Sequence, residues 1–214
     1  MADEKVMIIV GEGVVRRAPA VFSSVGLGSC VAVTLYDTGR CIGGLAHIML
    51  PGVRQGTTVW SGGEKGEWTG YERRKKGIRY KAPLADITSI VLSGKGGCCL
   101  DDPAKAAEHI SLDEVYHYAD TAVVALLKEM MNMGASLRSI VAKIAGGAKM
   151  FADGDHYEKS IGGRNVQSIK QLLKRGKIPV IGEDTGGSQG RNVDFYLDSG
   201  RVIISTIGGM TREI

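Results

Sequence analysis

Residues 30–50 read Cys30-Val-Ala-Val-Thr-Leu-Tyr-Asp-Thr-Gly-Arg-Cys-Ile-Gly-Gly-Leu-Ala-His-Ile-Met-Leu50. Two apolar, β-rich arms flank the short turn Asp37-Thr-Gly-Arg40, which is the pattern of a β-hairpin. A loop of two or of four residues centred on this turn gives the same register, in which Cys30 faces His47 on one side of the sheet. Directly opposed Cβ atoms lie about 4.5 to 5.5 Å apart, which suits a thiol and the imidazole that deprotonates it.

The composition is that of one globular domain. The chain has 214 residues, 43% of them hydrophobic, which is enough for one buried core and short for two. We therefore expect a single domain over residues 1–214. The formal net charge of +4 is modest, so the charge predicts no nucleic-acid partner. The N-terminal residues lack the pattern of a secretion signal and no apolar run is long enough for a membrane helix, so we expect a cytoplasmic protein without membrane insertion.

The four cysteines show no metal-ligand spacing, and no metal or other cofactor is predicted. A cytosolic chain keeps its thiols reduced, so a disulfide framework is not expected either.

Beyond the hairpin, strand patterns alternate with two helix patterns. Apolar residues at helical spacing run from Asp120, a predicted N-cap, to Gly134, and a second helix is predicted from its N-cap Asn165 to Gly176. Strands are predicted at 6–16, 86–92, 138–145, 178–182, 192–197 and 201–207. Hairpins mixed with strand-helix-strand units favour a layered α/β sandwich with mixed β-sheets and helices on the outer faces. Residues 52–116, rich in glycine and polar side chains, are predicted to form an inserted excursion.

The residues before Cys30 suit nucleophilic chemistry. Gly26-Leu-Gly-Ser29 allows a tight turn whose N–H groups converge, so the backbone of Gly28 and Ser29 is a candidate oxyanion hole. A thiol–imidazole pair also needs a third group to orient the imidazole, and the hydroxyls of Ser23 and Ser24 lie just upstream. Taken alone, a cysteine in an apolar strand is more often a small buried hydrophobic residue, so this pattern leaves both interpretations open.

Six segments of the chain resemble the CheD family of chemoreceptor glutamine deamidases. Gly26-Leu-Gly-Ser-Cys-Val-Ala-Val33 looks like the nucleophile segment of the family, and Gly44-Leu-Ala-His-Ile-Met-Leu-Pro51 looks like its histidine segment. Four more segments follow in the family's order: Tyr118-Ala-Asp-Thr-Ala122, Gly146-Gly-Ala-Lys-Met150, Ile161-Gly-Gly-Arg-Asn165, and Asp184-Thr-Gly-Gly187 with Gly190-Arg191. The resemblance covers residues 6–51 and 117–207.

This resemblance implies a set of roles. Cys30 would be the nucleophile, His47 the general base, and Ser24 would stand where the family has a threonine. The substrate would be glutamine side chains on the cytoplasmic helices of chemoreceptors, and no cofactor would be needed. The resemblance also allows a second role, as a mainly non-catalytic regulatory adaptor that binds a CheC-type phosphatase. In either role we expect a monomer. A general cysteine peptidase is disfavoured, because no peptidase signature surrounds Cys30.

Overall fold

The computed structural model describes residues 5–52, 114–150, 156–206 and 209–214, together with the backbone of four short strands in between. These four strands form two small two-stranded sheets: β6 (Thr57–Val59) with β9 (Glu108–Ile110), and β7 (Gly70–Arg73) with β8 (Ile78–Lys81). The strand predicted at 86–92 lies outside the described residues, as does most of the predicted excursion.

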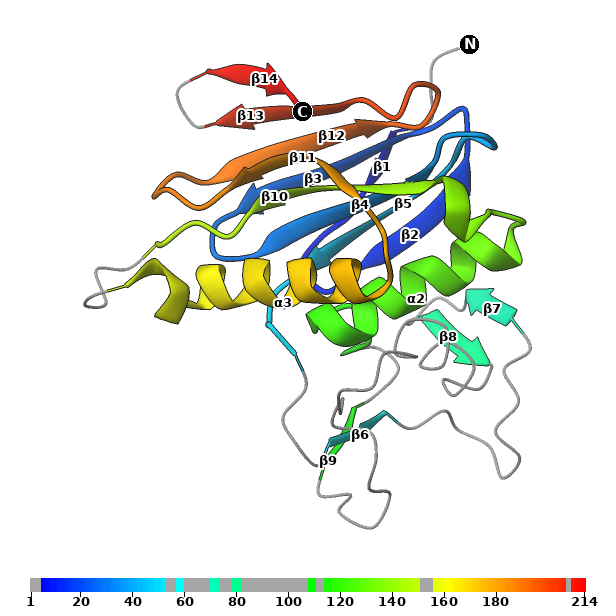
Figure 1. Ribbon diagram of the computed structural model, residues 1–214, viewed down its shortest axis with the longest axis horizontal. Coiled ribbons are helices and arrows are strands. Elements are labelled where there is room, and N and C mark those ends of the chain that lie inside the picture. Colours follow the sequence, from blue (N-terminus) through cyan, green and yellow to red (C-terminus); the bar gives the residue numbers. More distant parts are fainter. Residues whose placement is uncertain are drawn as a thin grey trace.

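Two five-stranded sheets form the body of the protein (Figure 1). The first sheet has the order β1 (Lys5–Met7), β3 (Val21–Leu27), β12 (Arg191–Tyr196), β13 (Val202–Thr206), β14 (Thr211–Glu213). The second has the order β11 (Val180–Thr185), β10 (Ile140–Gly146), β4 (Val31–Asp37), β5 (Ile42–Ile48), β2 (Gly13–Arg17). Each sheet is mixed, because β1–β3 and β10–β11 pair in parallel and the other neighbours pair antiparallel.

Two helices, α2 (Ala119–Asn132) and α3 (Ile161–Arg175), cover the outer face of the second sheet (Figure 1). One hydrophobic core fills the space between these helices and the second sheet. Another core lies between the two sheets, where Phe22 and Phe195 meet edge to face with their ring centroids 6.0 Å apart. The predicted layered α/β sandwich with mixed sheets is therefore confirmed, with both described helices on the same face.

The two helices begin at other residues than their sequence patterns predict. Tyr118 is the N-cap of α2, and Asp120 lies in the first turn, where its carboxylate accepts a hydrogen bond from the Thr121 N–H. Ser160 is the N-cap of α3, with its hydroxyl oxygen accepting from the Gly163 N–H at 3.1 Å. Asn165 is buried inside the helix, so its predicted capping role is wrong. Two glycines in the first turn hid the true start, because glycine is a poor helix former.

The hairpin exists, but its register differs from the predicted one by two residues. His47 pairs with Ala32, and the first pair after the turn joins Asp37 to Ile42. The loop extends through Cys41, which adopts a positive φ of 50°. The reason is the Asp37 carboxylate, which accepts hydrogen bonds from the Gly39 N–H at 2.9 Å and the Arg40 N–H at 3.2 Å and so stabilises a four-residue loop.

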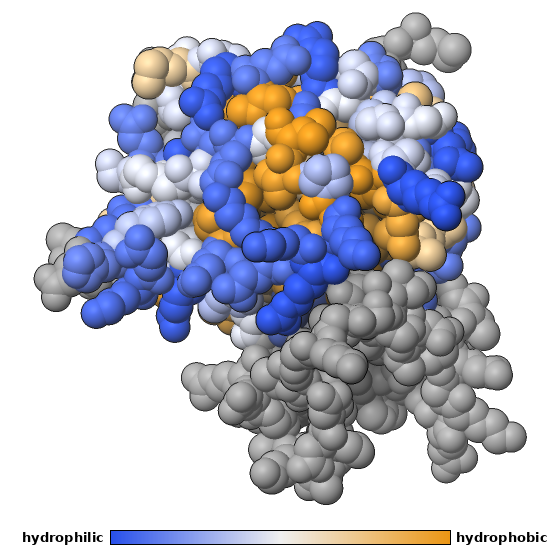
Figure 2. All heavy atoms as spheres, in the orientation of Figure 1, coloured by the Kyte–Doolittle hydropathy of each residue, from blue (hydrophilic) through white to orange (hydrophobic). Residues whose placement is uncertain are grey.

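The surface seen in Figure 2 carries a hydrophobic area above the two helices, over the strands, with polar side chains along its border. None of the described helices is long and apolar enough to cross a membrane.

Candidate active site

Ser24 and His47 come from different sheets and meet in the space between them. Ser24 lies on β3 and His47 on β5, and the Ser24 Oγ lies 2.8 Å from the His47 Nδ1. Both side chains are buried, with exposed fractions of 0% and 1%. The third predicted residue, Cys30, immediately precedes β4 and packs against the same core. The structure thus brings Ser24 and His47 into direct contact.

Cys30 lies diagonally across from His47 rather than directly opposite. His47 pairs with Ala32, and Cys30, two residues before Ala32 and just outside β4, packs against the same core as Ala32. Cys30 is half-buried, which leaves its thiol partly open to solvent.

The hydrogen bonds of Ser24 define the tautomer of His47. The Ser24 hydroxyl donates its one proton to the Ile8 carbonyl at 3.0 Å. The Ser24 oxygen must therefore accept from the imidazole, which places the proton of a neutral His47 on Nδ1. The opposite nitrogen, Nε2, is buried and has no partner among the described residues. A neutral imidazole of this tautomer offers its free lone pair at Nε2, which is the atom that a general base needs.

Burial favours the neutral forms of both His47 and Cys30. Desolvation lowers the pKa of His47 from 6.5 to about 4, although the backbone of Ile8 favours the charged form. Burial likewise raises the pKa of the Cys30 thiol above its ordinary value, against a smaller lowering by its own backbone N–H. At neutral pH Cys30 is therefore a thiol and His47 a neutral imidazole.

Three successive carbonyls of the Cys30 segment are held in place by hydrogen bonds. The Gly28 carbonyl accepts from the Ala148 N–H at 2.8 Å, and the Cys30 carbonyl accepts from the Gly147 N–H at 2.7 Å. The Ser29 carbonyl accepts from the side chain of Asn165 at 2.9 Å. Sequence reasoning missed these partners, although the glycine-rich stretch after β10 was one signal of a close approach between backbones.

These hydrogen bonds also fix the direction of the neighbouring N–H groups. In a planar trans peptide the N–H points opposite to the carbonyl of the preceding residue. Ala148 and Asn165 bind the Gly28 and Ser29 carbonyls. The N–H groups of Ser29 and Cys30 therefore point away from Ala148 and Asn165. Neither N–H donates to another residue within the described part of the chain. Both are candidate donors to a ligand, together with the N–H of Gly28, and the predicted oxyanion role of Gly28 and Ser29 stays a prediction.

Four apolar side chains are exposed in the segments that adjoin Ile8, Ser24 and Gly28, and we call them the apolar rim: Ile9, Val10, Val25 and Met150. Val25 follows Ser24 directly, while Ile9 and Val10 follow the carbonyl that binds it. Met150 packs on Gly28, where an added Cβ would lie 3.1 Å from the Met150 Cγ. A surface of this kind suits contact with another macromolecule.

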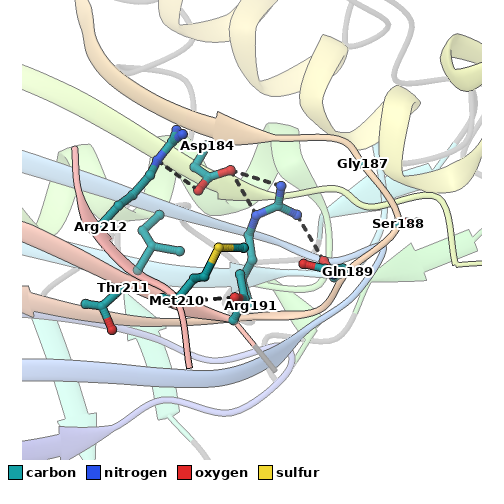
Figure 3. Close-up of a pocket in the computed structure, with 10 residues that line it drawn as sticks. Asp184, Gly187, Ser188, Gln189, Arg191, Met210, Thr211 and Arg212 are labelled. Carbon is teal, nitrogen blue, oxygen red and sulfur yellow. Dashed lines mark hydrogen bonds and ion pairs between the residues drawn. The ribbon is translucent and has the colours of Figure 1, made fainter. Parts of the chain in front are cut away.

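A separate cavity of about 600 Å³ lies between β11 and the far strands of the first sheet (Figure 3). Its centre is Asp184, whose carboxylate binds the Arg191 guanidinium at 2.9 Å and the Arg212 guanidinium at 3.2 Å. Arg191 also donates to the Gln189 carbonyl at 3.1 Å. None of the three predicted side chains, Cys30, His47 and Ser24, lines this cavity. Its charged side chains bind one another, so we interpret the ion pairs of Asp184 as a link between the two sheets.

Comparison with known proteins gives a consistent set of matches. The family model described as CheD chemotactic sensory transduction matches residues 102–206. The chain is similar to the chemoreceptor glutamine deamidase CheD of Thermotoga maritima, with 33% identity across 96% of this chain and 94% of that protein. A probable chemoreceptor glutamine deamidase CheD from Moorella thermoacetica is 33% identical across 99% of this chain and 96% of that protein. Another, from Caldanaerobacter subterraneus subsp. tengcongensis, is 29% identical over the full length of both chains.

Proposed function

This chain belongs to the CheD family, and we propose that it hydrolyses glutamine side-chain amides of chemoreceptors to glutamate, with Cys30 as nucleophile and His47 as general base. The observation that carries this proposal is the His47 imidazole, bound by Ser24 at Nδ1 and without a partner at Nε2 among the described residues, in the space between the sheets where Cys30 also packs. Such an arrangement of nucleophile, base and orienting group is the general form of a covalent hydrolase site.

The reaction begins with proton transfer from the Cys30 thiol to the Nε2 of His47. The sulfur attacks the amide carbon of the glutamine, and the carbonyl oxygen becomes a tetrahedral oxyanion. The imidazolium then returns its proton to the amide nitrogen, the carbon–nitrogen bond breaks, and ammonia leaves a glutamyl thioester on Cys30. His47 next takes a proton from water, the resulting hydroxide attacks the thioester, and the thiol is restored as glutamate departs.

The oxyanion is held by the N–H groups of the Cys30 segment. The Ser29 and Cys30 N–H groups are directed by the bound carbonyls that precede them, so they require no reorientation as charge develops. Removing one oxyanion donor from a hydrolase typically costs about 3 to 4 kcal/mol of transition-state stabilisation. The backbone around Cys30 therefore contributes to the rate as much as the base does.

The surroundings of Cys30 support a protein substrate. The apolar rim exposes four hydrophobic side chains in segments next to Ser24 and Gly28, which suits an amphipathic protein surface better than a small polar amide. The relative from Thermotoga maritima carries the name chemoreceptor glutamine deamidase. We therefore propose glutamines on receptor helices as the substrate.

The direct test is ammonia release from purified receptor cytoplasmic fragments. Wild-type protein is expected to release ammonia, and Cys30→Ala is expected to reduce the rate to the uncatalysed level. Cys41→Ala is the matched control, since Cys41 is also a half-buried free cysteine but lies at the hairpin turn. An active Cys30→Ala protein would overturn the proposed nucleophile, and cleaved fragments without ammonia would indicate a peptidase instead.

A further inference from the structure

Asn165 lies wholly inside the protein, between the segment that carries Cys30 and the segment that carries His47. Its exposed fraction is 0%. The Asn165 Nδ2 donates to the Ser29 carbonyl at 2.9 Å and to the Met49 carbonyl at 2.9 Å. Ser29 directly precedes Cys30, and Met49 follows His47 by two residues. One amide group thus connects the two segments on which the candidate nucleophile and base lie.

We propose that Asn165 is a positioning residue that holds the Cys30 peptide and the end of the His47 strand in the geometry that the reaction needs. The catalytic side of this inference rests on the proposed function. The effect of Asn165 on the Cys30 thiol can be tested without any substrate. Asn165 touches neither the substrate nor the reacting atoms and acts through Ser29 and Met49.

The contact with Ser29 bears directly on the oxyanion. The Ser29 carbonyl and the Cys30 N–H belong to one planar peptide and point in opposite directions. By binding the carbonyl, Asn165 fixes the N–H that would donate to the oxyanion. The neighbouring peptide is fixed independently by Ala148, which binds the Gly28 carbonyl. Loss of Asn165 therefore frees one of the two donors and leaves the other in place.

The start of α3 is built so that Asn165 can reach these carbonyls. A Cβ at Gly162 would lie 2.5 Å from the Gly147 carbonyl oxygen, and one at Gly163 would lie 2.1 Å from the Tyr157 carbonyl oxygen. Only glycine permits such approaches between backbones. The contact at Gly162 brings the helix close to the residues that follow β10, and Asn165 in the next turn binds the Cys30 segment.

The hydrogen bonding of Asn165 also argues against a role in packing alone. Its Oδ1 is buried and has no partner among the residues that the structure describes. An unpartnered buried oxygen is unfavourable, so a side chain that only filled space would be better apolar. The two bonds from Nδ2 account for an amide at this position.

The test uses two variants and one matched control. Asn165→Ala removes both hydrogen bonds, and Asn165→Asp keeps the size of the side chain but presents oxygen to the two carbonyls. Thr34→Val is the control, because Thr34 is also buried and makes one hydrogen bond on β4, from its hydroxyl to the Lys143 carbonyl at 3.2 Å. All four proteins are compared with the full chain intact, and thermal unfolding verifies that each is folded.

Two measurements are made on each protein. The first is the pH dependence of Cys30 alkylation by iodoacetamide, followed by mass spectrometry of the Cys30 peptide, which requires no substrate. The second is kcat and KM for ammonia release from receptor fragments. Both Asn165 variants are expected to shift the midpoint of the alkylation profile and to lower kcat at least tenfold with KM changed less than about threefold. Thr34→Val is expected to match the wild type in both.

The alkylation profile decides the outcome. If folded Asn165→Asp and Asn165→Ala proteins keep the wild-type profile and the wild-type kcat, the inference is wrong. If Asn165→Ala does not fold, Asn165→Asp alone decides. If wild-type protein releases no ammonia while the Asn165 variants still shift the alkylation profile, the proposed function fails and the positioning role of Asn165 stands.

Discussion

Ser24 links the His47 imidazole to the Ile8 carbonyl, and its small side chain fits a position that is 0% exposed. Replacing it with alanine removes the acceptor at Nδ1 but leaves the Ile8 carbonyl close to the imidazole. We therefore predict that Ser24→Ala lowers kcat about tenfold, the effect of losing one hydrogen bond worth about 1.4 kcal/mol. Ser24→Thr keeps the hydroxyl and should retain most of the rate.

The measurement is kcat for ammonia release as a function of pH. Ser24→Ala should also move the acidic limb of the profile, because the tautomer of His47 is then less well defined. Equal rates for Ser24→Ala and wild type across the whole pH range would show that the imidazole needs no orienting hydroxyl.

The buried state of His47 makes stability depend on pH. Its pKa in the folded protein is about 4, below the ordinary value of 6.5, so the folded state binds the proton less readily than the unfolded state. The contribution of the neutral His47 to the free energy of unfolding is complete above pH 6.5 and is lost as the pH falls to about 4. Over this window the free energy of unfolding should fall by roughly 3 kcal/mol through His47 alone.

Urea unfolding at about pH 7 and about pH 4.5 measures this difference, and His47→Gln is the comparison. The variant cannot titrate in this range, so its stability should fall less steeply between the two conditions. If the free energy of unfolding fell by the same amount between the two pH values in both proteins, the assignment of a buried, neutral His47 would be wrong.

At the level of elements, the sequence predicted the existence of the strands and helices well. It predicted their pairing and register less well. Alternating apolar residues predicted the hairpin and the shared face of Cys30 and His47. The register escaped prediction because it depends on Asp37, whose carboxylate also accepts from the Ser136 N–H at 2.7 Å and the Ser139 hydroxyl at 2.8 Å. Those partners lie about a hundred residues further along the chain, so no local turn pattern reveals them.

Helix α3 gives a second example. The apolar spacing of its residues predicted the helix, whereas glycines at its start concealed the first turn. One of them, Gly162, also has a tertiary role, since it allows the helix to approach the end of β10. Asn165 looked like a cap because asparagine is a common cap, and only the packed structure shows the two carbonyls that it binds.

This packing predicts a sharp difference between two glycines of α3. Gly162→Ala places a methyl group 2.5 Å from the Gly147 carbonyl oxygen and should destabilise the protein by about 1 to 3 kcal/mol. It should also lower activity, because α3 moves away from the Cys30 segment. Gly176→Ala is the control, since Gly176 has a φ of −71° and its nearest neighbours are 3.5 Å away.

Thermal and urea unfolding compare these two variants. The control should leave the protein as stable as the wild type or more stable by up to about 1 kcal/mol. If Gly162→Ala is as stable and as active as Gly176→Ala, the close approach of α3 to β10 does not exist.

At the scale of the whole molecule, the site depends on how the two sheets are held together. Ser24 and His47 belong to different sheets, so their contact requires correct packing of the sandwich. The Asp184 carboxylate, on the second sheet, binds Arg191, on the first, and their side chains are 14% and 9% exposed. Sequence motifs named these residues, but no pattern could show that they face each other across two sheets.

Asp184→Ala leaves the Arg191 guanidinium buried without its partner and should lower the free energy of unfolding by roughly 3 kcal/mol. The control is Glu213→Ala, which removes an exposed ion pair with Arg201 and should leave the melting temperature nearly unchanged. Thermal unfolding measures both. Equal melting temperatures for the two variants would show that the Asp184 cluster does not link the sheets.

The central claim is that Cys30 converts receptor glutamines to glutamates. The measurement that tests it most directly is peptide mass spectrometry of receptor helices after incubation with wild-type protein or with Cys30→Ala. Conversion of an amide to an acid adds about one dalton, and our account predicts this gain at defined glutamines with wild-type protein and its absence with Cys30→Ala. The same gain with both proteins, or with neither, would contradict it.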